Sequence, residues 1–298
     1  MVRETYSKKD VGEYMASKFV AIKIDAEKGE GPDLAKRFGV RGFPTFVIVD
    51  PEGQEVDRLV GFRKPEPFLA ELKDIAGEKS FRALKKRATE NPDDLDAALD
   101  LAEKYQERSD FDQALGLYEK VRGSEKASAS SKLRAEGRIA MIGYVKSRGK
   151  ELGSLEKFYE AHKGGADAVD IARLLYQVYQ RGEDRKKVVE MGDYLLANAP
   201  EREDATFLND YSWYLSTKDV DAKKALELAR RAVAKSPDAP AILDTLAEAC
   251  YRNGLFEEAV ETQKKAVKLA EESQRGEFEE RLQKFEQALK EKARSARV

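Results

Sequence analysis

The pattern of hydrophobic and polar positions at the start of the chain predicts helices that alternate with strands. Val11, Tyr14 and Met15 recur at helical spacing. Phe19 to Ile24 then has few polar positions, which predicts a strand covered on both faces. A second helix should begin at Gly31-Pro32, because proline is favoured at the first helical position.

The next stretch predicts an antiparallel hairpin. Thr45 to Val49 is a β-branched and aromatic run directly after Pro44, a residue that should open a strand rather than lie inside it. Asp50 to Gly53 places proline and glycine where a type I turn prefers them, and Glu55 to Val60 alternates polar with apolar residues. The Phe43–Pro44 bond at this bend is a candidate cis peptide.

From about Gly77 the apolar pattern is helical throughout. A charged helix, Glu78 to Thr89, should end before Asn91-Pro92, because a residue that precedes proline disfavours the helical conformation. Beyond it, helix pairs recur with a period of about 34 residues. The clearest pair starts at Pro240 and turns at Gly254, and its small and apolar positions are Leu243, Leu246, Ala247, Ala259 and Ala266.

Weaker pairs keep parts of the same pattern. The first sets Leu101, Ala102 and Tyr105 against Ala114 and Tyr118. A later one, closed by Pro237, sets Leu208, Tyr211, Ser212 and Leu215 against Ala225 and Ala232. A unit with Ala172, Leu175, Tyr179 and Pro200 departs from the pattern at Tyr176, and Ser131 to His162 fits poorly. The polar-backed helix expected over Glu277 to Ala293 suits the cap that a repeat array needs at its end.

The segment Gly39-Val40-Arg41-Gly42-Phe43-Pro44-Thr45-Phe46, with the hairpin after it, resembles the thioredoxin-like superfamily over residues 1–76. The helix pairs look like tetratricopeptide (TPR) repeats. Together the resemblances imply an α/β plus all-α chain, in which an incomplete thioredoxin-like sheet with helices precedes a TPR-like α-solenoid. The expected divisions are 1–76 for a partial thioredoxin-like domain, 77–92 for a helical linker and 93–298 for the repeats with their C-terminal capping helix.

The resemblance also implies a segment that this sequence lacks. Thioredoxin-like proteins carry a strand and a Cys-x-x-Cys motif just upstream of the matched part, whereas the one cysteine in the sequence is Cys250. We therefore expect a sequence that begins partway through a longer protein, and a sheet of about three strands without its central one. Backbone groups beside that gap lose their partners, so this part should be weakly stable alone and lean on the following helices.

Composition excludes several functions. Lys plus Arg number 54 and Asp plus Glu 56, so a net charge of -2 gives no general attraction to nucleic acid. Every apolar run is far shorter than the roughly 20 residues of a membrane-spanning helix. One cysteine and one histidine supply no metal site, since zinc sites need three or four such ligands, and we expect no cofactor.

Phe43, Pro44 and Thr45 are the candidate peptide-binding residues. In the resembling fold, the backbone before the cis-proline pairs with an extended substrate segment. No catalytic residue is predicted. Cys250 is expected to be a buried apolar residue of a repeat rather than a nucleophile, and His162 to lie at a helix C-terminus, where the helix dipole favours it.

Two main function classes follow. The favoured one is a redox-inactive scaffold whose protein or peptide partner contacts the concave face of the repeats and the cis-proline loop. The alternative is a thiol–disulfide oxidoreductase whose Cys-x-x-Cys lies upstream of Met1. In a third interpretation the repeats only position the first domain. The chain as it stands is expected in the cytoplasm, whereas a signal peptide before Met1 would direct it to the periplasm or out of the cell.

Overall fold

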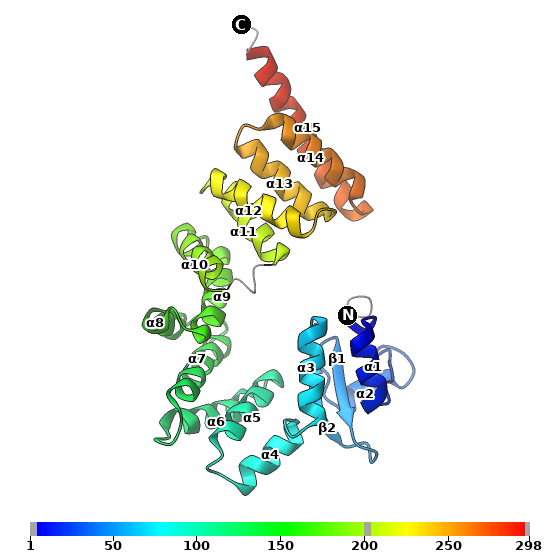
Figure 1. The fold of residues 1–298 in the computed structure, drawn as a ribbon, viewed down its shortest axis with the longest axis vertical. Coiled ribbons are helices and arrows are strands. Elements are labelled where there is room, and N and C mark those ends of the chain that lie inside the picture. Colours follow the sequence, from blue (N-terminus) through cyan, green and yellow to red (C-terminus); the bar gives the residue numbers. More distant parts are fainter. Residues whose placement is uncertain (1–4, 200–203, 296–298) are drawn as a thin grey trace. The chain divides into compact units, whose positions relative to one another are not determined.

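The structure is a computed structural model and describes residues 5–199 and 204–295. It consists of two compact units, Met1–Ala161 and His162–Val298, each with its own buried residues. The first unit begins with an α/β part and continues into helices, and every described element of the second is a helix (Figure 1). The expected order of an α/β part followed by helix pairs is confirmed.

The α/β part contains a two-stranded antiparallel sheet and three helices. Its elements are α1 (Lys9–Lys18), α2 (Gly31–Arg37), β1 (Thr45–Val49), β2 (Glu55–Val60) and α3 (Pro65–Ala76). The predicted hairpin is present, and its turn is closed by the Gly53 N–H, which donates to the Asp50 carbonyl at 2.9 Å. The Phe43–Pro44 peptide bond is cis.

The strand predicted from Phe19 to Ile24 is absent, and that prediction was wrong. The segment is irregular, and Val20, Ile22 and Ile24 are 92%, 77% and 51% exposed. Over the described residues the sheet therefore has two strands instead of the expected three or so. The physical reason is that a strand is stabilised by hydrogen bonds and side-chain pairs with a neighbouring strand. In the resembling fold, the strand that lies between Phe19–Ile24 and β1 in the sheet comes from the segment that this sequence lacks.

A small apolar core covers one face of the hairpin. Its buried side chains are Val11, Leu59, Phe68, Leu72 and Ile75, from α1, β2 and α3. The Phe46 ring of β1 packs on them, with ring centroids 5.0 Å from Phe68 and 5.5 Å from Tyr6. This core holds α1 and α3 against the hairpin.

The first unit continues with α4 (Phe81–Glu90), α5 (Leu95–Glu107), α6 (Phe111–Gly123), α7 (Ala129–Lys146) and α8 (Gly153–His162). Asp94 caps α5, where its carboxylate accepts from the Ala97 N–H at 2.9 Å. Helices α5 and α6 form the first predicted pair, and Ala102, Ala114 and Tyr118 are fully buried in it.

The second unit contains α9 (Ala166–Arg181), α10 (Arg185–Asn198), α11 (Ala205–Thr217), α12 (Ala222–Lys235), α13 (Pro240–Arg252), α14 (Phe256–Leu269) and α15 (Glu272–Ser295). Consecutive helices pack as α9 with α10, α11 with α12 and α13 with α14, as the pattern predicts. Ala247 and Ala259 are fully buried in the pair that starts at Pro240. Pro200, a member of the predicted unit before it, lies outside the described residues.

Helix α15 begins five positions before the predicted capping helix and packs on α14. Two ion pairs also connect it to α13. The Arg281 guanidinium lies 2.7 Å from the Asp244 carboxylate, and the Lys284 ammonium lies 3.1 Å from that of Glu248. Both carboxylates are nearly buried, so these pairs neutralise charges that would be costly alone.

Candidate functional site

The predicted peptide-binding residues lie where the chain enters β1. The Phe43 ring is 69% exposed, and Pro44 and Thr45 are half-buried. The Thr45 hydroxyl donates to the Gly42 carbonyl at 2.7 Å, and the Gly61 N–H donates to the Pro44 carbonyl at 2.8 Å. These bonds hold the loop against the end of β2 and leave the Phe43 side chain accessible.

In the part of the chain that the structure describes, strand β1 pairs with β2 on one side and with no strand on the other. The Pro44 carbonyl and the Asp50 N–H both bond toward the β2 side, to Gly61 and Gln54. Because backbone groups alternate in direction along a strand, the N–H and C=O groups of the odd-numbered positions 45, 47 and 49 point to the other edge. Within the described ranges, no second strand pairs with that edge.

The chain's thiol does not complete a redox site. Cys250 lies in α13 with no exposed surface, and burial, with a smaller effect of Glu258, raises the pKa of its thiol to about 12. A protonated, buried thiol is a poor nucleophile, which agrees with the structural role predicted for it. His162 is the last residue of α8, as predicted.

The described residues form neither a metal-ligand cluster nor a membrane-spanning helix. No group of three or more His, Cys, Asp or Glu side chains is arranged to hold a metal ion in the part of the chain that the structure describes. Among the described helices, none combines the length and apolar character needed to cross a membrane.

A buried carboxylate joins the α/β part to the helices that follow it. Asp57 of β2 is fully buried, and its carboxylate lies 2.9 Å from the Arg108 guanidinium and 2.9 Å from the Lys104 ammonium. It also accepts from the Phe81 N–H at 3.0 Å. Asp57 is therefore a specific contact through which the α/β part depends on the next helices. A buried carboxylate has lost its hydration, so its charge must be balanced by these partners.

Arg82 of α4 adds a second connection to the hairpin. It donates to the Asp50 carboxylate at 2.7 Å and to the Glu55 carbonyl at 2.8 Å. The hydrogen bond from Arg82 holds the pKa of Asp50 below its usual range. The hairpin is thus held from α4 both at its turn and along β2.

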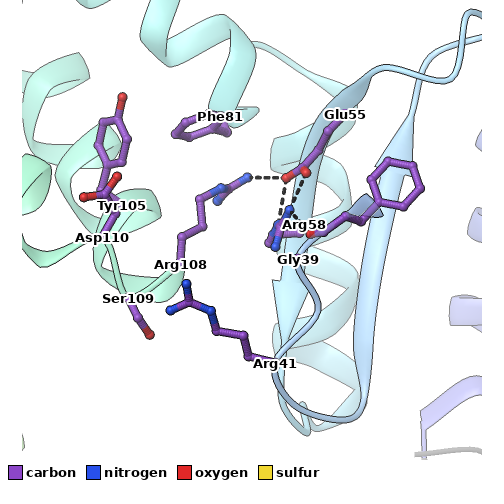
Figure 2. Close-up of a pocket in the computed structure, with 10 residues that line it drawn as sticks. Gly39, Arg41, Glu55, Arg58, Phe81, Tyr105, Arg108, Ser109 and Asp110 are labelled. Atoms are coloured by element: carbon purple, nitrogen blue, oxygen red, sulfur yellow. Dashed lines mark hydrogen bonds and ion pairs between the residues drawn. The ribbon is translucent and has the colours of Figure 1, made fainter. Parts of the chain in front are cut away.

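A cleft of about 570 Å³ lies beside these contacts (Figure 2). Arg41, Arg58 and Arg108 line it, together with Glu55 and the Phe81 ring. Sequence reasoning did not select the three arginines. Arg41 lies in the segment that carries the thioredoxin-like resemblance, but no local pattern indicates that Arg108, directly after α5, lines the same cleft.

Comparison with known proteins identifies the α/β part. The thioredoxin-like domain family matches residues 1–76. This part of the chain is thioredoxin-like. Thioredoxin H2 of Arabidopsis thaliana is 44% identical over 55 residues, covering 17% of this chain and 39% of that protein. The SPbeta prophage-derived thioredoxin-like protein YosR of Bacillus subtilis is 43% identical over 44 residues, covering 15% and 54%. The chain thus spans about two fifths of the length of thioredoxin H2 and about half of the length of YosR.

The solved structures similar to this chain include TPR proteins. YrrB, described as a TPR protein with an unusual peptide-binding site, has a TM-score of 0.47 at 17% identity, covering 63% of this chain and 93% of that chain. The TPR2AB-domain:pHSP90 complex of yeast Sti1 has a TM-score of 0.35 at 17% identity, covering 74% of this chain and 95% of that chain. The pairing of helices in this chain is established by its own contacts.

Proposed function

We propose that the chain is a redox-inactive scaffold that binds an extended peptide segment of a protein partner at the open edge of β1 and the neighbouring Phe43–Pro44–Thr45 loop. The observation that carries this proposal is the open edge itself. Positions 45, 47 and 49 direct N–H and C=O groups away from β2. An extended peptide can bond to such groups as an added strand.

Exposed apolar side chains in the same α/β part support the proposal. Phe43 at the start of β1 and Val20 and Ile22 after α1 are large, exposed apolar residues. A partner that binds this part could bury these side chains, which gains free energy through the hydrophobic effect. In this proposal the partner's remaining contacts fall on the concave face of the helix pairs, the surface that such arrays present.

Amide hydrogen exchange tests the strand-addition site. The probe is a short peptide of alternating valine and threonine with flanking lysines. Binding should protect the amides of Thr45, Val47 and Val49, while those of Phe46 and Ile48, already directed to β2, change little. A peptide that leaves the three odd-numbered amides unprotected contradicts the proposal.

A pair of variants tests the loop. Phe43→Ala should weaken binding of the peptide, because it removes the exposed ring beside the edge. Val145→Ala is the control, since Val145 is 49% exposed and lies in α7, away from this loop in the sequence and outside the α/β part. Equal weakening by the two variants would show that the peptide binds apolar surface in general, and not this loop.

The alternative function is a thiol–disulfide oxidoreductase completed by a Cys-x-x-Cys upstream of Met1. It is favoured by the thioredoxin-like match and by the fraction of the relatives that the chain spans. The DNA before the start codon tests it, because an in-frame Trp-Cys-x-x-Cys would establish the dithiol. The chain as given should reduce insulin no faster than background, and turnover above background would contradict the scaffold.

A further inference from the structure

The cleft beside β2 contains more cationic side chains than its own carboxylates neutralise. Arg41, Arg58 and Arg108 line it, and Glu55 and Asp110 are the acidic residues among its walls. Behind the wall, Lys104 pairs with Asp57 at 2.9 Å. The cleft therefore carries a surplus of one positive charge.

Two of the three guanidinium groups are fixed in place. Arg58 donates from Nε to Glu55 at 2.8 Å and from Nη2 to the Phe38 carbonyl at 2.8 Å. Arg108 contacts Asp57 at 2.9 Å and Glu55 at 3.3 Å, and its guanidinium lies 4.0 Å from the centre of the Phe81 ring. Their side chains are only 16% and 11% exposed, so both form a rigid cationic wall.

The third guanidinium, that of Arg41, is available. Within residues 5–199 and 204–295 it forms no hydrogen bond or ion pair, and the residue is exposed. Figure 2 shows its side chain extending across the cleft toward Ser109 and the stem of Arg108. An anion in the cleft would give Arg41 a partner, and the Arg58 and Arg108 side chains would add attraction from the wall.

We propose that this cleft binds a carboxylate of the partner, carried by an acidic side chain or by a peptide C-terminus, with Arg41 as its main donor. A guanidinium presents two parallel N–H groups that match the two oxygens of a carboxylate. The single surplus charge matches a monoanion better than a phosphate group, which carries about two negative charges. Phe81 and Tyr105 supply an apolar wall for the carbon atoms that carry the carboxylate. This inference rests on the proposed function only in taking a peptide as the carrier.

The test is an NMR titration that follows the Arg41 side-chain Nε–H with three short alanine-rich probes. One probe has an internal glutamate and an amidated end, one has a free C-terminal carboxylate without glutamate, and one has neither. We expect the Arg41 signal to shift with at least one carboxylate probe and to remain in place with the neutral one. The first two probes distinguish the acidic side chain from the chain terminus.

Variants show whether the effect belongs to the cleft. Arg41→Gln should weaken carboxylate binding about tenfold, because a charged hydrogen bond is lost. Arg41→Lys should restore only part of it, and Arg122→Gln, which removes an exposed arginine of α6 paired with Glu119, should have no effect. Equal loss in the Arg41 and Arg122 variants would overturn the site.

Competing anions provide the remaining outcomes. Inorganic phosphate that binds more tightly than the carboxylate probes would overturn the assignment to a carboxylate, as would a matching shift with chloride at equal ionic strength. The alanine-rich probes lack the alternating apolar residues used to test the β1 edge. If the alanine-rich probes do not bind the cleft, the valine–threonine peptide can still protect the Val47 amide. The two proposals can therefore fail independently of each other.

Discussion

The thioredoxin-like part and the α13–α14 pair satisfy their backbone groups in different ways. In α13 and α14 the backbone bonds close within each helix, and the pair buries small residues such as Ala247 and Ala259 between its helices. In the thioredoxin-like part, β2 is the one strand that pairs with β1 among the described residues, so the backbone groups on the other edge of β1 bond to no strand there. A repeat array can therefore lose or gain units, whereas a sheet that lacks one strand keeps an open edge.

The thioredoxin-like part compensates through contacts with the helices after it. Its own apolar core is small, and Asp57 connects it to α4 and α5 through the Phe81 N–H, Lys104 and Arg108. Its order should depend on a few polar contacts, while that of the helix pairs should depend on tight packing. Substitutions in each region can separate these two dependences.

The largest expected effect is at Asp57. Asp57→Ala should lower the free energy of unfolding of the first unit by about 3–5 kcal/mol, because the mostly buried Lys104 ammonium loses its paired carboxylate and Arg108 keeps only that of Glu55. Urea denaturation measures it. Asp74→Ala, at an exposed acid of α3, is the control and should change the value by no more than about 0.5 kcal/mol. A similar small change at Asp57 would show that the α/β part does not depend on this contact.

A somewhat smaller effect should appear where two helices approach closely. A Cβ atom on Gly192 of α10 would lie 2.5 Å from the Tyr211 ring of α11, which is fully buried. Gly192→Ala should therefore cost about 1–3 kcal/mol of the second unit's stability through overpacking. In Gly276→Ala the added methyl meets no atom within 4 Å, so the variant should be neutral or stabilised by up to about 1 kcal/mol. Equal unfolding midpoints for the two variants would contradict close packing at Gly192.

The buried thiol gives the second unit a pH dependence. Below pH 9.0 both folded and unfolded Cys250 are protonated, so its contribution to stability is present in full. Between pH 9.0 and about 12 the unfolded chain loses this proton while the folded chain keeps it, so stability falls as pH rises. The limiting slope is about 1.4 kcal/mol per pH unit.

Comparison with Cys250→Ala separates the contribution of the Cys250 thiol to the free energy of unfolding from that of the other titrating groups. The stability difference between the parent and the variant, measured by urea denaturation across this alkaline range, should narrow as the pH rises. A difference that stays constant would mean that the folded thiol ionises as readily as the unfolded one.

The smallest effect is expected in the segment that fails to form a strand. Ile22→Lys should change the free energy of unfolding by no more than about 0.5 kcal/mol, because Ile22 is 77% exposed. Leu59→Ala, in β2 with no exposed surface, should cost about 2–5 kcal/mol in the same thermal or urea titration. A loss at Ile22 as large as that at Leu59 would place Ile22 in a buried strand.

Local patterns in the sequence predicted the elements whose contacts are local. The turn over Asp50 to Gly53 and the pair that starts at Pro240 both have residues with fixed positional preferences, and both are present. The run from Phe19 to Ile24 has equally strong strand character, yet strand formation depends on a neighbour that the sequence does not contain.

In the candidate sites, too, the sequence indicates some residues, whereas only the fold brings the others together. The resemblance of the Gly39 to Phe46 segment to thioredoxin-like proteins indicates Phe43, Pro44 and Thr45 as binding residues, and this role remains a prediction. The arginine cleft could not be found from sequence, because Arg41 comes from the loop after α2 and Arg108 from the end of α5. Only the fold brings such distant positions to one wall.

The most direct test of the two-stranded thioredoxin-like part is native-state amide hydrogen exchange on the chain without a partner. Amides of Ala21, Ile22 and Val47 should exchange much faster than those of Leu246 and Ala247 inside α13. Among the described residues, Ala21 and Ile22 lie outside any strand, and the Val47 N–H points away from β2, its strand partner. Protection of Ala21, Ile22 and Val47 as strong as in α13 would contradict the account, since it would require a further strand beside β1.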